Sequence, residues 1–425
     1  MEVTQSAGPR DRRRAVIGTS RRGVRVSRRT ALFTVVGGAL MIGLSLLRWV
    51  EPGIHAYPDT TWYVRDALLV RGWDQVDADR EAALVRCTYA TRPALAPEAR
   101  ADCLVAAQDL LRYPPRYEEI FSARPGYPLL VAPFSAALGR SGVVVATLAV
   151  AAADGIIVIM LVRLLGGSLP GQLFAGGVFL LLPSGFWSTR LLSEGTMLTG
   201  LLVTLCGVVL LQRGSRRAGV TLFLAGFGIA FLTKSANATV LALALLASGL
   251  TVAWISRPGG QNGRRLAALS GAVLLTTVVA STLLGWPGLE TSVQDMATDH
   301  FHRPDVPHVW SALAQVNMQF WPKLFVDWFH DPVPVLGCFA ACAWLAIRLR
   351  ALSIPLLLAC LSGVLLLVAH PVASEWDRLL VPIWIPVALT AGLASDALSS
   401  MKLPWFRGGW KSDGRSFLPP PHLDR

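Results

Sequence analysis

The chain has 425 residues, of which 53% are hydrophobic and 16% are charged, and its mean hydropathy is +0.50. This composition, with repeated long apolar runs, excludes an ordinary soluble protein and makes lipid the solvent for most of the chain. The net charge of +12 does not indicate a nucleic-acid partner, because the basic residues are concentrated in one tail and in short loops between apolar runs.

The first segment, residues 1–30, is a basic tail with nine arginines against Glu2 and Asp11. Ten apolar segments follow, most of them near the ~20 residues that cross a bilayer. They are residues 31–49, 141–163, 168–187, 195–212, 219–233, 237–256, 265–284, 333–348, 353–370 and 379–395. The sequence therefore predicts an all-α polytopic membrane protein with about ten transmembrane helices. Because some segments are short, the sequence is compatible with any number of spans from nine to twelve.

The basic loops predict the orientation of a membrane domain over residues 31–395. With the N-terminus in the cytoplasm and ten alternating spans, every basic cluster faces inward, and so does the C-terminal tail, residues 396–425. These clusters are Arg213, Arg216 and Arg217; Arg257, Arg264 and Arg265; and Arg348 and Arg350. Residues 127–139 are too few to span and contain Pro133, so a re-entrant or interfacial hairpin is favoured. Whether they cross the membrane is left open.

Two long segments, residues 50–126 and 285–332, then face outward. The first carries twelve acidic and nine basic residues, which indicates a solvated extracytoplasmic loop with juxtamembrane helices. Cys87 and Cys103 lie in it, in what would be an oxidising compartment. A disulfide there would add roughly 3 kcal/mol of stability, and paired and unpaired cysteines are equal alternatives.

A helix that starts near Pro58 places Asp59, Tyr63 and Asp66 on one face, with Trp62 beside them. Proline favours the first turn, and a carboxylate there is stabilised by the helix dipole. One interpretation is a helix-start carboxylate beside an interfacial aromatic belt. The other is a catalytic carboxylate.

Three later features accompany this aspartate. Arg124-Pro125 and Tyr127-Pro128 follow the long loop, Ser193-Glu194 lies at an outer membrane edge, and Arg378 with Leu379 and Pro382 precedes the last span. In this order the set resembles the GT-C superfamily of polyprenyl-phosphate-sugar-dependent glycosyltransferases, which includes bacterial mannosyl- and arabinosyltransferases and protein O-mannosyltransferases. Leu379 stands where that superfamily usually has tyrosine, and Thr60 stands where some members have a second acidic residue.

The resemblance implies an inverting glycosyltransferase that moves a sugar from a polyprenyl-phosphate donor to an acceptor on the extracytoplasmic side. Asp59 is expected to be the general base, because it is an outer-face carboxylate beside aromatic rings. Arg378 is expected to hold the donor phosphate, because guanidinium binds phosphate oxygens bidentately. The remaining expected site residues are Arg124 for donor phosphate, and Tyr63, Trp62, Asp66 and Glu194 for substrate. The acceptor, a glycan, lipid or protein, is not identified. No cofactor is expected, and a divalent metal requirement is left open.

Each assignment has a structural alternative. Arg378 could pair with Glu375 or Asp377, Glu194 could pair with Arg190, and Lys234 could meet a phosphate or a lipid headgroup. Asp77 and Asp79 form a D-x-D pattern that is more typical of solvated surface. Asp299, His300, His302 and His308 fit no recurrent zinc spacing. Residues 310–332 predict an amphipathic interfacial helix or, alternatively, a lid over the site.

Two other functions compete with an enzyme. A transporter or flippase for a lipid-linked glycan would bury paired polar residues at mid-membrane, where Asp154 is the clearest ionisable residue. A non-catalytic subunit of a cell-envelope assembly complex would use the large loop to bind a partner. The excess of arginine over lysine is typical of GC-rich genomes, so we expect a bacterial plasma-membrane protein with membrane lipids around it and no nucleic-acid partner.

Overall fold

The computed structural model describes residues 28–256, 260–373 and 375–400. The chain divides into two units after Val36, and the packing below is that of the second unit. The elements of the described residues, of which α1 extends over both units, are α1 Arg28–Val50, β1 Gly53–Ile54, α2 Pro58–Val70, α3 Gln75–Thr88, β2 Thr91–Arg92, α4 Pro97–Leu110, α5 Pro115–Ser122, α6 Gly126–Leu138, α7 Arg140–Leu165, α8 Leu169–Leu181, α9 Pro183–Ser188, α10 Glu194–Gln212, α11 Arg216–Thr233, α12 Ser235–Ile255, α13 Gln261–Leu283, α14 Leu289–Ala297, α15 Val309–His330, α16 Pro332–Leu349, η1 Arg350–Leu352, α17 Ser353–Cys360, α18 Ser362–Ala369, α19 Trp376–Leu379, η2 Val381–Ile383 and α20 Trp384–Ser400.

Eight helical segments of the described residues are long and apolar enough to cross a membrane. They are Phe33–Val50, Arg140–Leu165, Glu194–Gln212, Arg216–Thr233, Ser235–Ile255, Gln261–Leu283, Pro332–Ala369 and Val381–Leu398. The predicted spans 333–348 and 353–370 fall in one continuous apolar segment, and the predicted span 168–187 is divided between α8 and α9. The chain is thus an α-helical membrane protein, and the count of ten spans stays a prediction.

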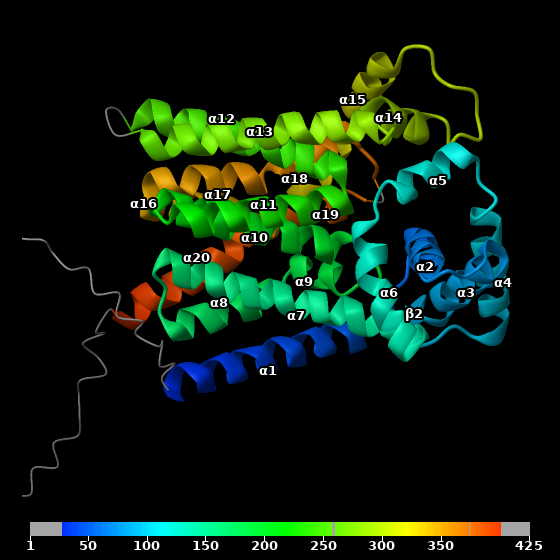
Figure 1. Ribbon diagram of the computed structural model, residues 1–425, viewed down its shortest axis with the longest axis horizontal. Coiled ribbons are helices and arrows are strands. Elements are labelled where there is room, and N and C mark those ends of the chain that lie inside the picture. Colours follow the sequence, from blue (N-terminus) through cyan, green and yellow to red (C-terminus); the bar gives the residue numbers. More distant parts are fainter. Residues whose placement is uncertain (1–27, 257–259, 374, 401–425) are drawn as a thin grey trace, which may run out of the picture. The chain divides into compact units, whose positions relative to one another are not determined.

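Small residues bring the long helices into close contact. A side chain at Gly207 of α10 would lie 2.4 Å from the backbone nitrogen of Phe223 on α11, and one at Gly249 of α12 would lie 2.4 Å from that of Ala267 on α13. Within lipid, helices gain little from excluding water, so such backbone approach supplies packing energy instead. Figure 1 shows α10 with α11 and α12 with α13 side by side.

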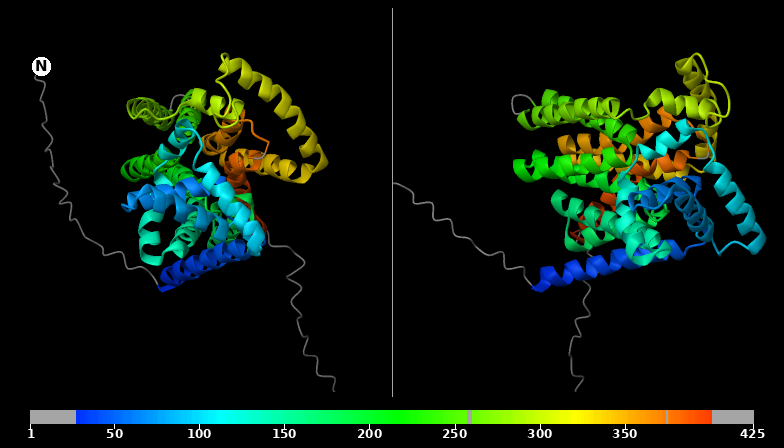
Figure 2. Two further views of the ribbon diagram at one scale, coloured as in Figure 1. Left: turned by 90° about the vertical axis from the view of Figure 1, so that its right-hand side faces the viewer. Right: turned by 45° about the vertical axis from the view of Figure 1, so that its right-hand side comes forward.

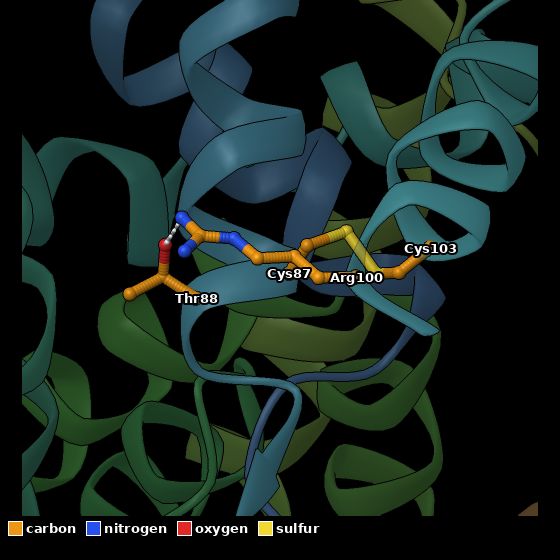
Figure 3. Close-up of a disulfide and its surroundings, with 4 residues drawn as sticks. All are labelled: Cys87, Thr88, Arg100 and Cys103. Carbon is orange, nitrogen blue, oxygen red and sulfur yellow. Dashed lines mark hydrogen bonds between the residues drawn. A yellow bond between two sulfur atoms is a disulfide. The ribbon is translucent and has the colours of Figure 1, made fainter. Parts of the chain in front are cut away.

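The helices of the two predicted outer loops, α2–α5 and α14–α15, gather at one end of the membrane helices (Figures 1 and 2). The strands β1 and β2 pair antiparallel, with Gly53 opposite Arg92. A disulfide joins Cys87 on α3 to Cys103 on α4, and Arg100 donates a hydrogen bond to Thr88 beside it at 3.2 Å (Figure 3). The loop is therefore a packed helical layer whose helices are covalently linked.

Two further elements bear on the predictions. Residues 127–139 form most of α6, a 13-residue helix that is followed by Gly139 at φ +60. Residues 309–330 form the predicted amphipathic helix, α15. It buries Phe320 and Leu324 against Leu367 and Leu380, while Phe329 on it is 83% exposed. Such an apolar exposed face is typical of a helix at a membrane surface.

Candidate functional site

The start of α2 fixes the position of Asp59. The helix begins at Pro58, as the sequence predicted, and places Asp59 in its first turn. Thr60 Oγ1 accepts a hydrogen bond from the Tyr57 backbone N–H at 2.9 Å and donates one to the Leu191 carbonyl oxygen at 2.8 Å. The carboxylate is therefore held at the helix start, beside the segment that leads into α10.

Asp59 and Arg378 meet although they are 319 positions apart. Arg378 Nη2 lies 2.9 Å from Asp59 Oδ2, and their side chains are only 9% and 13% exposed. Arg378 comes from the short helix α19, whose start is held by a hydrogen bond from the Arg378 N–H to Asp377 Oδ1 at 2.9 Å. Both residues lie outside the candidate spans, so they meet at one edge of the membrane domain.

Glu194, the first residue of α10, extends this contact. Its Oε1 lies 2.9 Å from Arg378 Nε and 2.6 Å from Lys234 Nζ. Lys234 occupies the extended break between α11 and α12, at φ −155. Glu375 Oε2 lies 3.4 Å from Arg378 Nη2. We call Asp59, Glu194, Lys234, Glu375 and Arg378 the interhelix ion network.

Burial makes this network electrostatically strong. Charges that are nearly excluded from water attract one another far more than they would in solvent, and they also lose hydration energy. Burial alone would lower the pKa of Arg378, but Glu194, Asp59 and Glu375 outweigh it and raise the pKa well above its usual value. Arg378 therefore stays a cation throughout the physiological pH range.

Two polar atoms of the network lack a hydrogen bond among the described residues. Glu194 Oε2 is buried without a donor, and the Arg378 Nε hydrogen is not directed at an acceptor even though Glu194 Oε1 is near. Unpaired polar groups in a protein interior are costly, so those that persist often serve a ligand. An incoming hydroxyl and an incoming anion would satisfy these two atoms respectively.

Tyr63 lies one turn beyond Asp59 and joins a second polar group. Its hydroxyl accepts hydrogen bonds from Ser193 Oγ at 2.9 Å and from Arg124 Nη1 at 3.3 Å. The predicted residues Asp59, Tyr63, Arg124, Glu194 and Arg378 therefore come together in space. Glu194 pairs with Lys234 and Arg378. The alternative partner Arg190 instead contacts the ring of Phe186 and donates to His55 Nδ1 at 3.0 Å.

The side chains of Trp62 and Asp66 make their contacts outside the interhelix ion network. Trp62 is fully buried and stacks on Phe121, so its ring does not form an open surface for a sugar. Asp66 Oδ1 accepts from Arg65 Nη2 at 2.9 Å, and Arg65 also bonds Glu118 at 2.8 Å. With Asp79 Oδ1 4.0 Å from Arg65 Nε, these residues form a separate group on α2, α3 and α5. We call Arg65, Asp66, Asp79 and Glu118 the loop ion cluster.

The histidines near residue 300 are engaged locally. His300 Nδ1 lies 3.0 Å from Asp295 Oδ1, and His302 Nδ1 lies 2.8 Å from the Asp299 carbonyl oxygen. Within the described part of the chain, no three His, Cys, Asp or Glu side chains are grouped closely enough to hold a metal ion.

The sequence alone did not favour a role for Lys234, and it noted Glu375 only as an alternative partner of Arg378. One signal was present: Lys234 lies at the end of a predicted span on the side where the positive-inside bias disfavours lysine. A basic residue in such a place is expected to have an acidic partner. Which carboxylate it meets depends on how α10, α11 and α12 pack, and no local pattern encodes that.

Two cavities among the described residues lie near the loop helices and under α18, and neither of these two is lined by Asp59 or Arg378. One, of about 150 Å³, lies between α2, α3, α6 and α7, and a small one lies under α18 beside Asn237. Comparisons of the chain with protein-family models, with curated proteins and with solved structures gave no match.

Proposed function

We propose that this protein is a membrane glycosyltransferase of GT-C type, in which Asp59 acts as general base and Arg378 holds the phosphate of a polyprenyl-phosphate sugar. The observation that carries the proposal is the 2.9 Å contact between these two side chains at one edge of the membrane domain. A donor of this class places its phosphate at the headgroup level. A carboxylate and a guanidinium are therefore needed together at that level.

The ion pair suggests how the base is released. While Arg378 holds Asp59, Oδ2 of the carboxylate is occupied by the guanidinium. A donor phosphate that binds Arg378 would take over this guanidinium and free Asp59. The acceptor hydroxyl then gives its proton to Asp59 as its oxygen bonds the anomeric carbon, and the bond from that carbon to the phosphate oxygen breaks with inversion. General-base assistance of this kind contributes typically ~10²–10⁴-fold in rate.

Glu194 and Lys234 support this arrangement. Lys234 fixes Glu194 through the 2.6 Å contact, and Glu194 in turn lies beside Nε of Arg378, whereas Asp59 contacts Nη2. The free Glu194 Oε2 is suited to accept a hydrogen bond from a sugar hydroxyl. The bonds from Arg124 and Ser193 to Tyr63 hold the phenol ring in place one turn from the base.

The distribution of buried charge favours an enzyme over a transporter. The interhelix ion network gathers at one edge of the membrane domain, whereas Asp154 within the span Arg140–Leu165 bonds, among the described residues, only to the hydroxyls of Ser188 and Thr199. A transporter would be expected to concentrate paired charges at mid-membrane. On the proposed topology the site faces the periplasm-like side of a bacterial plasma membrane.

The test is transfer from a panel of radiolabelled polyprenyl-phosphate sugars into an acceptor-containing membrane fraction. We expect Asp59→Asn to lower the transfer rate at least ~10²-fold at normal protein levels. Glu118→Gln is the matched control, because it also removes a paired carboxylate of the loop helices, and it should retain transfer. If labelled glycoside forms at equal rates with wild type and Asp59→Asn, this catalytic assignment is wrong. If the label crosses the bilayer without a new glycosidic bond, the protein is a transporter.

A further inference from the structure

The larger cavity lies apart from the interhelix ion network. It has a volume of about 150 Å³ and is lined mainly by residues of α2, α3, α6 and α7. Its interior is apolar, with Val64, Ala67, Val85 and Val131 all at most 2% exposed. An apolar cavity of about this volume accommodates a group of about six carbon atoms.

The mouth of the cavity lies at a membrane edge. Arg140, the first residue of the span Arg140–Leu165, and Trp73 both line it, and Trp73 is 39% exposed. Val70 and Leu138, which precede the lining residues Arg71 and Gly139 in the chain, are 55% and 50% exposed. Exposed apolar side chains beside a span are covered by lipid in a membrane, so chains of the bilayer lie within reach of the opening.

One cation of the cavity lacks an acidic partner. Arg140 is neutralised by Glu81, which its guanidinium contacts at 2.5 Å and 2.8 Å. Arg71 instead lies 5.4 Å from the Trp73 ring and 3.4 Å from Ser135 Oγ, with no carboxylate within 4.0 Å among the described residues. The cavity therefore has a net positive charge at its rim and an apolar interior.

We propose that this cavity binds an anionic membrane amphiphile, with its negative headgroup on Arg71 and the upper part of its apolar chain between α2 and α6. The charge at the rim selects an anion, and the volume admits a chain segment rather than a whole lipid. Such a ligand would link the loop helices α2 and α3 to the membrane helices α6 and α7. The site is independent of the proposed transferase chemistry, because no residue of the interhelix ion network lines it.

Trp73 provides a direct test, because bromine atoms on a lipid chain quench the fluorescence of a nearby tryptophan. The full-length protein in zwitterionic detergent is titrated with phosphatidylglycerol brominated in the upper half of its chains, and in parallel with the matching phosphatidylcholine and brominated fatty acid. Subtracting the signal of Trp73→Phe isolates the contribution of Trp73. We expect the anionic lipid to quench the Trp73 fluorescence saturably. Its half-quenching concentration should be about fivefold lower than that of phosphatidylcholine, because one arginine near a membrane surface favours an anionic lipid by about that factor.

Variants then distinguish binding of the lipid headgroup from binding of the lipid chain. Arg71→Gln should raise the half-quenching concentration of phosphatidylglycerol to that of phosphatidylcholine, whereas Arg112→Gln, at an exposed residue just after α4, should not. Ala67→Phe should abolish saturable quenching by filling the interior, and Ala136→Phe tests the same point from the rim if Ala67→Phe fails to fold. Stronger quenching by the fatty acid than by the phospholipid would identify a single-chain anion as the ligand. The proposal would be overturned if all three probes quenched Trp73 equally and Arg71→Gln changed none of the three signals. It would also be overturned if saturable quenching persisted in both Ala67→Phe and Ala136→Phe.

Discussion

The helix α2 carries two ion clusters that are built from the same chemistry and have different surroundings. In the loop ion cluster, Arg65 meets carboxylates on α2, α3 and α5, and these are 15%, 29% and 40% exposed. In the interhelix ion network, Asp59 meets a guanidinium 319 positions away, and Glu194 is only 2% exposed. The first cluster fastens neighbouring loop helices to one another. The second brings together charges from α2, α10, α19 and the start of α12, and their burial costs hydration energy. Buried groups of charges of this kind are common at functional sites.

Replacing the two arginines should separate the clusters most strongly. Arg378→Lys keeps the positive charge but removes the planar fork that grips phosphate, so we expect the transfer rate to fall at least ~10²-fold. Arg65→Lys should leave the rate of the folded protein within a few-fold of wild type. The measurement is the rate of transfer from the radiolabelled donor per mole of monodisperse protein. If the rate fell equally in both variants, the predicted difference in function between the two clusters would be wrong.

A double-mutant cycle provides a second comparison. Glu194→Gln, Lys234→Met and their combination should give a coupling free energy of about 1–3 kcal/mol, because both side chains are buried and in direct contact. The corresponding cycle with Arg65→Met and Glu118→Gln should give a smaller value, since Glu118 is 40% exposed. Unfolding of each variant in mixed micelles supplies the free energies. A smaller coupling for Glu194 and Lys234 than for Arg65 and Glu118 would contradict the burial argument.

His55, which belongs to neither cluster, and Asp66 of the loop ion cluster should respond to pH in opposite directions. Burial, together with Arg190, lowers the pKa of His55 from 6.5 to about 4. Folding therefore favours neutral His55, and this stability is complete above pH 6.5 and lost as the pH falls toward 4. Burial raises the pKa of Asp66 above 3.8, so the contribution of Asp66 is greatest at low pH and is lost as the pH rises through the folded-state pKa.

We expect wild type to lose about 1–2 kcal/mol relative to His55→Gln between pH 7 and pH 5. Asp66→Asn should become more favourable relative to wild type as the pH is raised over the acidic range. Thermal unfolding of the three proteins in one detergent measures both trends. Parallel curves for wild type and His55→Gln would show that His55 is not held neutral.

The sequence predicted a good part of this arrangement because much of it is local or topological. Pro58 before an aspartate specifies a helix start, and long apolar runs specify membrane helices. It could not predict that 168–187 would divide near Leu182, because hydropathy does not register a break before Pro183 within an apolar run. Trp62 shows a second limit. Its position next to Asp59 suggested a sugar platform, yet helical geometry points it toward α5, where Phe121 covers it.

The break between α11 and α12 is a third case. Its residues read as a short polar link between two spans, and the pairing of Lys234 with Glu194 follows only from the packing of α10 against α11 through Gly200 and Gly226. Local signals therefore located Asp59 and its helix, whereas long-range packing determined which charges surround it.

The interhelix ion network joins three carboxylates to two cations, so it already carries an excess of one negative charge when all its groups are ionised. An anion that reaches Arg378 adds to this excess in a medium that screens charge poorly. The anion must therefore displace a carboxylate from the guanidinium rather than add to all three. Ligand binding at this edge of the protein should accordingly break the contact between Arg378 and one of its carboxylates.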